Sequence, residues 1–289
     1  MSPAPLPYFI GCPSWSENAW RDGLYPADAK PAQFLALYAK VFNAVEGNTT
    51  FYARPAPATV ERWAQSMPEG FRFTAKFPRD ISHEGDLREQ VTAAQTFVQL
   101  LKPLGGRVAP LWLQLPATFS PQALGALAYF IDELQHPLAV EVRHPAFFAK
   151  GEDERQLNRL LLERGVERIC LDPRALFSCT SRDPAVLHAQ SKKPRVPPRP
   201  AAFSHNPQVR FIGHPQLEAN EPFLTPWVDK IATWIEEGRA PYIFLHTADN
   251  LLAPKLAQRF HARLMERLPG LQALPDIDRA PPAQQLGLL

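Results

Sequence analysis

The sequence has few cysteines, no long apolar run and almost no net charge. The three cysteines, Cys12, Cys170 and Cys179, are too few and too scattered for a disulfide framework or a zinc ribbon, which favours a reducing compartment. No stretch approaches the ~20 apolar residues that a membrane span needs. The first residues lack the basic start and the apolar segment of a signal peptide. We therefore expect a cytoplasmic protein that does not associate with membranes.

The balance of charge excludes a protein that binds nucleic acid through its overall charge. The 31 Lys and Arg residues and the 29 Asp and Glu residues leave a formal net charge of +2, so any anion must be bound by a local patch. The sequence also has no His-Glu-x-x-His and no Cys-x-x-Cys motif. A divalent metal is therefore possible but is not indicated by the spacing of its ligands.

The abundant feature is a regular alternation of two hydrophobic patterns. Short apolar runs with period two predict strands at residues 8–15, 44–52, 72–78, 109–116, 138–144, 168–172, 209–214 and 242–247. Runs with a period near 3.6 predict helices at 31–40, 57–65, 87–101, 121–133, 152–163, 222–237 and 253–267. Eight such units match an α/β fold of the TIM (β/α)₈ barrel type, which typically needs ~250 residues. A doubly wound open sheet is the alternative, weakened by the lack of a glycine-rich turn after the first strand.

We expect a single barrel domain over residues 1–268 and an extended, Pro-rich C-terminal tail over 269–289. A long loop at 174–208 follows the sixth strand and contains a basic, Pro-rich tract at 191–200, with a possible short helix at 184–192. In a barrel this loop lies on the face that carries function. It is either a lid or binding loop or an ordinary solvated loop, because composition alone does not separate the two.

Alternate residues of a strand face opposite ways, which sorts the polar residues of the predicted strands onto one side. The pairs that share this inner face are Glu46 and Asn48, Thr74 and Lys76, Trp112 and Gln114, Glu141 and Arg143, Cys170 and Asp172, Arg210 and His214, and Phe244 and His246. Polar residues at the carboxyl ends of barrel strands usually mark a catalytic or binding site. The alternative is an internal network of salt bridges without a functional role.

The charges of this set favour an anionic ligand that bears phosphate or carboxylate, since Arg and Lys bind such groups and a carboxylate serves as acid or base. The predicted catalytic residues, as acid, base or metal ligand, are Glu46, His83, Glu141 and Asp172. The predicted ligand-binding residues are Trp15, Asn48, Tyr52, Lys76, Gln114, Arg143 and Arg210, of which Trp15 and Tyr52 could stack on a base or sugar.

Several of these segments resemble a known family. Residues 11–15 (GCPSW), 45–52 (VEGNTTFY), 73–78 (FTAKFP) with 81–83 (ISH), 112–116 (WLQLP) and 140–145 (VEVRHP) are similar to the YecE-like family, also called domain of unknown function 72. The resemblance runs from the first strand to past residues 244–247. The runs at 210–214 and 245–250 depart from the wider family and resemble its YecE branch. The resemblance implies a TIM barrel and supplies no reaction.

The last residues carry a second resemblance. Gln285, Leu286, Gly287, Leu288 and Leu289 are similar to the short peptides by which bacterial proteins dock onto the replication sliding clamp. A glutamine with two apolar anchors on a tether suits capture in a groove. The alternative is an ordinary apolar tail, because short motifs match by chance.

Three hypotheses of function follow. The first is a TIM-barrel enzyme that acts on a phosphate-bearing substrate, DNA or RNA included, with hydrolysis as the simplest reaction class. The second is a non-catalytic binding or adaptor protein that uses its basic loop and its tail, the latter on a sliding clamp. The third is a barrel that metabolises a sugar or a carboxylate.

Overall fold

The computed structural model describes residues 5–277, and strands alternate with helices along them. The strands are β1 (Phe9–Gly11), β2 (Ala44–Gly47), β3 (Arg72–Ala75), β4 (Leu111–Gln114), β5 (Leu138–Glu141), β6 (Glu167–Arg168), β7 (Cys170–Asp172), β8 (Gln208–Ile212) and β9 (Tyr242–His246). The α-helices are α1 (Phe34–Tyr38), α2 (Thr49–Tyr52), α3 (Pro57–Ser66), α4 (Arg79–His83), α5 (Val91–Leu100), α6 (Leu124–Leu134), α7 (Glu152–Glu163), α8 (Arg174–Ser178), α9 (Pro184–Lys192), α10 (Glu221–Glu236) and α11 (Ala253–Arg267). The short helix expected at 184–192 is therefore present as α9.

Seven short 3₁₀ helices complete the described elements. They are η1 (Asn18–Trp20), η2 (Pro31–Gln33), η3 (Leu87–Gln90), η4 (Lys102–Arg107), η5 (Pro121–Ala123), η6 (Pro145–Phe148) and η7 (Glu218–Asn220). Several begin with proline at the first helical positions, where its missing N–H costs nothing. They fill connections between strands and the longer helices.

The strands form three parallel sheets, ordered β1-β9-β8-β7, β2-β3 and β4-β5-β6. Every strand pair is parallel, as crossover helices require. The fold is thus α/β with parallel sheets, and the prediction is confirmed at that level. Closure into a (β/α)₈ barrel is not confirmed, because the hydrogen-bonded ladders do not run continuously from sheet to sheet.

Side chains hold the junction between β1 and β2, where ladder bonds are missing. One backbone bond crosses it, from Glu46 N to Cys12 O (3.1 Å). The Tyr38 hydroxyl donates to Ala44 O (2.9 Å) and accepts from Cys12 N (2.6 Å). A Cβ on Gly11 would lie 1.9 Å from Ala44 O, so this close approach of two backbones requires glycine.

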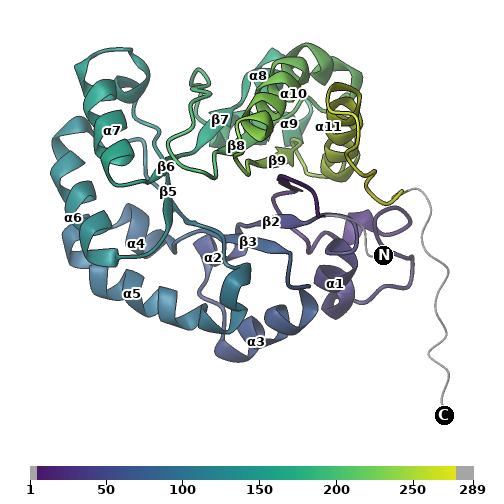
Figure 1. Ribbon diagram of the computed structural model, residues 1–289, viewed down its shortest axis with the longest axis horizontal. Helices are drawn as coiled ribbons and strands as arrows, with labels where there is room; N and C mark the ends of the chain where they lie inside the picture. Colours follow the sequence, from purple (N-terminus) through teal and green to yellow (C-terminus); the bar gives the residue numbers. More distant parts are fainter. Residues whose placement is uncertain (1–4, 278–289) are drawn as a thin grey trace.

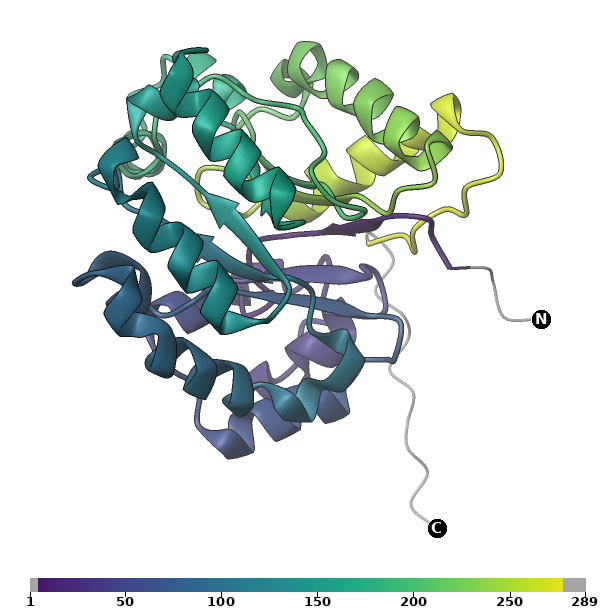
Figure 2. The same ribbon diagram turned by 60° about the vertical axis from the view of Figure 1, so that its left-hand side comes forward.

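The helices lie on the outside of the strands in both ribbon views (Figures 1 and 2). Their apolar faces pack on one face of the strands, where most of the core is gathered, including Val45, Phe73, Val140 and Phe211. A smaller apolar cluster occupies the other face and contains Ala44, Ala109, Trp112, Ala139, Ile169, Tyr242 and Phe244. The predicted inward facing of Trp112 and Phe244 agrees with this second cluster.

The facing predicted for the sixth strand is wrong by one residue. Ile169 lies in the inner cluster, whereas Cys170 belongs to the core beneath the helices. Arg168 and Asp172 face the helices with Cys170, because each finds its partners there: Glu154 of α7 for Arg168 and Trp227 of α10 for Asp172. A shift of one residue exchanges the two faces of a whole strand.

Past α11 the described chain packs back onto that helix. Gln258 Nε2 donates to Pro275 O (2.8 Å), and His261 Nε2 lies 2.8 Å from Gln272 O. The predicted partner-binding residues Gln285, Leu286, Leu288 and Leu289 lie outside the described residues. Among residues 5–277, none of the helices combines the length and the apolar composition that a bilayer crossing demands.

Candidate functional site

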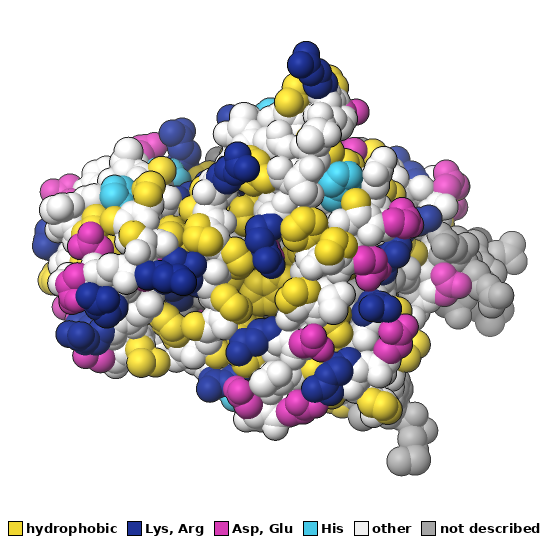
Figure 3. Space-filling model, turned by 90° about the horizontal axis from the view of Figure 1, so that it is seen from above, with side chains coloured by type: hydrophobic (Ala, Val, Ile, Leu, Met, Phe, Trp, Pro, Cys, Tyr) yellow, Lys and Arg dark blue, Asp and Glu magenta, His cyan; other side chains and the backbone are white. Residues whose placement is uncertain are grey.

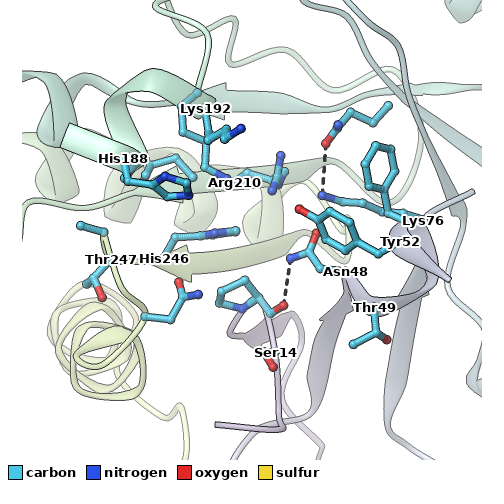
Figure 4. Close-up of a pocket in the computed structure, with 18 of the residues that line it drawn as sticks. Ser14, Asn48, Thr49, Tyr52, Lys76, His188, Lys192, Arg210, His246 and Thr247 are labelled. Carbon is cyan, nitrogen blue, oxygen red and sulfur yellow. Dashed lines mark hydrogen bonds between the residues drawn. The ribbon is translucent and has the colours of Figure 1, made fainter. Parts of the chain in front are cut away.

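A pocket of about 970 Å³ opens where the carboxyl ends of the strands meet. Its wall comes from segments far apart in the sequence (Figure 4). The segment after β1 contributes Ser14 and Trp15, β2 is followed by Asn48 and Tyr52, and the end of β3 by Lys76 and His83. The remaining polar lining residues include Gln114, Arg143, His188, Lys192, Lys193, Arg210, His246, Thr247 and Asn250.

A network of ion pairs centred on Arg210 forms the floor of the pocket. The Arg210 guanidinium donates to both oxygens of Glu46, at 3.0 and 2.7 Å, and to Glu141 Oε2 at 2.5 Å. Lys76 Nζ lies 2.9 Å from Glu46 Oε1, and Arg143 donates to Glu141 Oε1 at 2.8 and 2.7 Å. The strands therefore bring together two acids and three bases that are separated in sequence.

The two carboxylates of this network are ionised. Burial alone would raise the pKa of the Glu46 carboxyl, but Arg210, Lys76 and His246 outweigh it and hold that pKa well below its usual range. Burial likewise opposes ionisation of Glu141, and Arg210 and Arg143 again lower its pKa strongly. Neither glutamate is among the residues that line the pocket. They lie beneath it as counter-ions that fix the basic side chains.

Two bases of the network also rest on an aromatic ring. The Lys76 ammonium and the Arg210 guanidinium each lie 5.4 Å from the centroid of Trp112, within the range of a cation–π contact. Burial and the repulsion of Arg210 lower the pKa of Lys76 to about 8. Glu46 and the Gln114 amide oxygen, 3.2 Å from Nζ, favour the charged form. At neutral pH the Lys76 ammonium therefore remains mostly protonated.

The pocket carries an excess of positive charge. Lys76, Arg143 and Arg210 already outnumber Glu46 and Glu141. Lys192, Lys193 and Arg79 also line the pocket, against one acidic lining residue, Glu17. Figure 4 shows Lys76, Lys192 and Arg210 around the same open space. Because the two buried carboxylates are already paired, the surplus cations are available to an anionic ligand.

Two histidines at the pocket are neutral. Burial, with the repulsion of Arg143 and Arg79, lowers the pKa of His83 to about 4, and its Nδ1 lies 2.9 Å from Ser82 Oγ. Burial also lowers the pKa of His246 to about 3, although Glu46 acts against this shift. The short contact between His246 Nε2 and Glu46 Oε2 (2.8 Å) then places the proton on Nε2, since a carboxylate can only accept.

The neutral polar residues of the pocket differ in how many of their hydrogen-bonding groups already have a partner within the protein. Asn48 Nδ2 donates to Pro13 O (2.9 Å), which fixes the amide and leaves its oxygen for another donor. Thr247 is buried and its hydroxyl has no hydrogen-bond partner among the residues that the structure describes. An unsatisfied buried hydroxyl is costly, which is typical of a group that meets a ligand or water.

The two predicted stacking residues lie in different environments. Trp15 is only 7% exposed and packs edge-on against Trp63, with ring centroids 5.3 Å apart. Tyr52 is 83% exposed, and its ring meets Phe51 at a right angle. Tyr52 is therefore free to stack on a ligand at the mouth of the pocket, whereas Trp15 forms part of its wall.

Asp172 lies apart from the other predicted site residues. It is fully buried, yet it does not line the pocket. Its oxygens accept from the Arg174 guanidinium at 2.9 and 2.8 Å and from Trp227 Nε1 at 2.7 Å. The structure thus gathers the remaining predicted residues around one pocket and places Asp172 in a structural contact between β7, α8 and α10.

Sequence reasoning missed Lys193, His246 and Thr247 as site residues. Lys193 belongs to the basic tract that was predicted to be either a binding loop or a solvated one, and its entry into the pocket favours the former. The strand pattern places His246 on the inner face, but His246 is not among the predicted catalytic or ligand-binding residues. Within residues 5–277, no group of three or more His, Cys, Asp and Glu residues is placed to hold a metal ion.

Comparisons with known proteins identify the family. The profile described as "Protein of unknown function DUF72" matches residues 9–283. The chain is 42% identical over 272 residues to UPF0759 protein YecE of Escherichia coli K12, covering 93% of this chain and 97% of that protein. The protein described here belongs to this family.

Solved structures show the same fold. A DUF72 family protein of Enterococcus faecalis superposes with a TM-score of 0.67 at 17% identity, over 95% of this chain and 99% of that one. One of Thermotoga maritima gives a TM-score of 0.64 at 21% identity, over 90% and 98%. At such identities the likeness extends to the fold alone.

Proposed function

We propose that the protein binds a phosphate-bearing ligand in the pocket at the carboxyl ends of its strands. The observation that supports this most is the surplus of cations above a floor whose two carboxylates are already paired. Arg143 is the principal phosphate ligand, since its guanidinium is fixed by Glu141 and is 16% exposed at the side chain. A fork fixed in this way suits two parallel hydrogen bonds to phosphate oxygens.

The other residues of the pocket have separate roles in this proposal. Because the pKa of Lys193 is lowered to about 7, its partly protonated amine contributes only part of a positive charge to the phosphate. Arg210 and Lys76 attract the phosphate electrostatically from the floor of the pocket without direct contact. Asn48 and Thr247 offer an amide oxygen and an unpaired hydroxyl for the rest of the ligand. Tyr52 stacks on a planar group at the mouth.

We also propose a revised assignment of proton transfer for a hydrolytic reaction. Glu46 and Glu141 are poor acids and weak bases, because basic neighbours hold their pKa values far below neutrality. His83 lines the pocket, is neutral near pH 7 and has one ring nitrogen beyond its contact with Ser82. In this proposal His83 is the general base because it is unprotonated and lines the pocket, although its pKa of about 4 makes it a weak one, and Glu46 and Glu141 orient the cations.

We further propose that the three sheets make up an open (β/α)₈ barrel in which β6 and β7 are two parts of the sixth strand. The single bridges between Phe73 and Val108 and between Lys76 and Trp112 support this, as they join β3 to the strand after it. The bond from Ile169 N to Val140 O (2.9 Å) continues the contact of β5 past β6. In a barrel of this kind, ligands bind at the carboxyl ends of the strands, where the pocket lies.

The proposal is tested by fluorescence anisotropy with a labelled oligonucleotide and by calorimetric titration with inorganic phosphate. The variants are Arg143→Met and Lys193→Met, and Lys102→Met is the control because Lys102 is exposed on η4 and does not line the pocket. Titrations at about 50 and about 200 mM salt separate ionic binding from other modes. We expect salt-sensitive phosphate binding that both pocket variants weaken and the control retains. Wild-type protein that binds neither probe contradicts the proposal.

Nucleic acid is the less favoured phosphate source. On the face shown in Figure 3, Lys and Arg side chains are interspersed with Asp, Glu and hydrophobic ones, and no continuous basic patch covers that face. Protein surfaces that bind nucleic acid without a deep pocket depend on such patches. We therefore expect the oligonucleotide to bind more weakly than a small phosphate ester.

The adaptor hypothesis depends on residues outside the described part of the chain. Docking of the tail on a replication sliding clamp stays a prediction, to be tested by a pull-down with purified clamp and a Gln285→Ala, Leu288→Ala variant. Retention that is equal in both proteins would exclude it. In the basic loop, Arg199 pairs with Glu154 of α7 (2.6 Å), so this arginine is already engaged within the protein.

A further inference from the structure

Lys193 differs from the other basic residues of the pocket. It follows the last residue of α9, and its backbone N–H donates to Ala189 O (3.1 Å), which fixes the chain at the end of the helix. Its side chain lines the pocket together with Arg210 and Lys76. Among residues 5–277, its ammonium group has no hydrogen bond or ion pair of its own, whereas Lys76 pairs with Glu46.

The surroundings of Lys193 disfavour its charged form. Burial lowers its pKa to about 7, and the positive charges of Arg210 and Lys76 act in the same direction. Glu46 and Glu141 act against this shift, but their oxygens are already bonded to Arg210, Lys76 and Arg143. Lys193 is only half-buried, but a lysine beside other cations keeps a sizeable neutral fraction, which is the nucleophilic form of an amine.

We propose that Lys193 is a nucleophilic amine that forms an imine with an aldehyde or ketone carrying a phosphate group. This inference rests on the proposed function, because the phosphate held at Arg143 brings the carbonyl carbon to the amine. The Lys193 nitrogen attacks that carbon, a C–N bond forms, and the carbonyl C–O bond breaks. The two protons of the neutral amine leave with the oxygen as water, so no oxidant or reductant takes part.

The arrangement of the pocket suits this chemistry in two ways. Arg210 and Lys76, whose positive charges attract an anion into the pocket, also disfavour the protonated form of Lys193 and so lower its pKa. Lys192, one residue before, is exposed and lines the same pocket, so it serves as an internal comparison for reactivity.

The experiment uses pyridoxal 5′-phosphate, an aldehyde with a phosphate group, and borohydride to reduce the imine to a stable secondary amine. The labelled lysines are identified by mass spectrometry of peptides after reaction near pH 7. Pyridoxal without phosphate measures the contribution of the anion site, and inorganic phosphate is the competitor. Lys193→Arg keeps a long basic side chain and removes the amine nucleophile, and Lys102→Met is the matched control at an exposed site.

We expect Lys193 to be labelled at least about tenfold faster than Lys192 and Lys102. The lowered pKa of Lys193 raises its neutral fraction near pH 7, and each unit of pKa changes that fraction about tenfold. Labelling should be slower with pyridoxal and slower with added phosphate. It should be lost in Lys193→Arg and kept in Lys102→Met. Even labelling of Lys193, Lys192 and Lys102 would overturn the inference.

The two proposals fail in different ways in this experiment. Binding of the phosphate probe without labelling of Lys193 overturns the amine role and leaves the proposed function standing. Preferential labelling of Lys193 that is equal with pyridoxal and unaffected by phosphate supports a reactive amine and contradicts the phosphate site. Circular dichroism of Lys193→Arg and of the control confirms that each variant is folded.

Discussion

Replacing Arg210 with methionine should destabilise the protein by about 3–5 kcal/mol, the usual cost of removing one member of a buried ion pair. Arg210 is 1% exposed and donates three hydrogen bonds, two to Glu46 and one to Glu141. Methionine keeps much of the volume against Trp112, so the loss reports the charge rather than a cavity.

The size of the loss within the range of about 3–5 kcal/mol depends on the partners that the two glutamates keep in Arg210→Met. Glu46 keeps Lys76 and His246, and Glu141 keeps Arg143, so neither carboxylate is left without a partner. We therefore expect the lower half of the range at about pH 8. Without Arg210 the pKa values of both glutamates in the folded protein rise, because the strongest opposing charge is gone. The loss should then be smaller at about pH 5, where protonation relieves the buried negative charge.

The assay is urea unfolding followed by circular dichroism and tryptophan fluorescence, with the free energy of unfolding obtained by linear extrapolation. Arg164→Met is the matched control, because Arg164 pairs with Asp132 at the surface (2.8 Å), where such a pair contributes about 0–1 kcal/mol. Equal losses in the two variants, or a loss below about 1 kcal/mol for Arg210→Met, would refute the assignment of Arg210 as the centre of a structural ion network.

Two further predictions concern the frame around the site. Gly11→Ala should lower the free energy of unfolding, measured in urea, by about 1–3 kcal/mol, because its Cβ would lie 1.9 Å from Ala44 O. The control Gly70→Ala should lower it much less, because a Cβ there would have nothing within 4 Å. Similar losses in the two variants would contradict the close approach of β1 and β2. Burial raises the pKa of Glu167 to about 7 in the folded protein, although hydrogen bonds from Ser204 and Phe203 oppose this. Between the usual glutamate pKa and about 7, the folded state therefore binds more protons than the unfolded state. Glu167 thus stabilises the folded protein fully below that interval, and this stabilisation is lost as the pH rises through about 7. Glu167→Gln should remove that component from the change in unfolding free energy between about pH 5 and about pH 8, and an unchanged pH dependence would exclude it.

The strands and most of their faces were predictable because polar and apolar residues alternate with period two. Glu46, Lys76, Glu141 and Arg210 meet in the structure because each stands at an inward position near the carboxyl end of its strand. The sixth strand is the exception: the sequence pattern places Asp172 on the inner face, whereas in the structure that face carries Ile169. The partners of Asp172, Arg174 and Trp227, come from helices whose placement the strand pattern does not contain.

The ion pairing of the two glutamates could not be predicted from the sequence either. Glu46 and Glu141 were predicted as acid, base or metal ligand, which is what carboxylates at strand ends usually do. Three bases crowd them, and only the folded geometry shows that these cations take up all four carboxylate oxygens. Lys193 could not be assigned either, because a basic, Pro-rich loop has the same composition whether it lies in solvent or enters a pocket.

The most direct test of the account is a crystal structure of the protein soaked with tungstate, a phosphate mimic whose anomalous scattering locates it without ambiguity. The account predicts one well-occupied tungstate in the pocket, within hydrogen-bond distance of the Arg143 guanidinium and near Lys193, and its loss from crystals of Arg143→Met. Tungstate bound only to surface lysines away from the pocket, or an empty pocket in soaked wild-type crystals, would contradict the claim that this site binds phosphate.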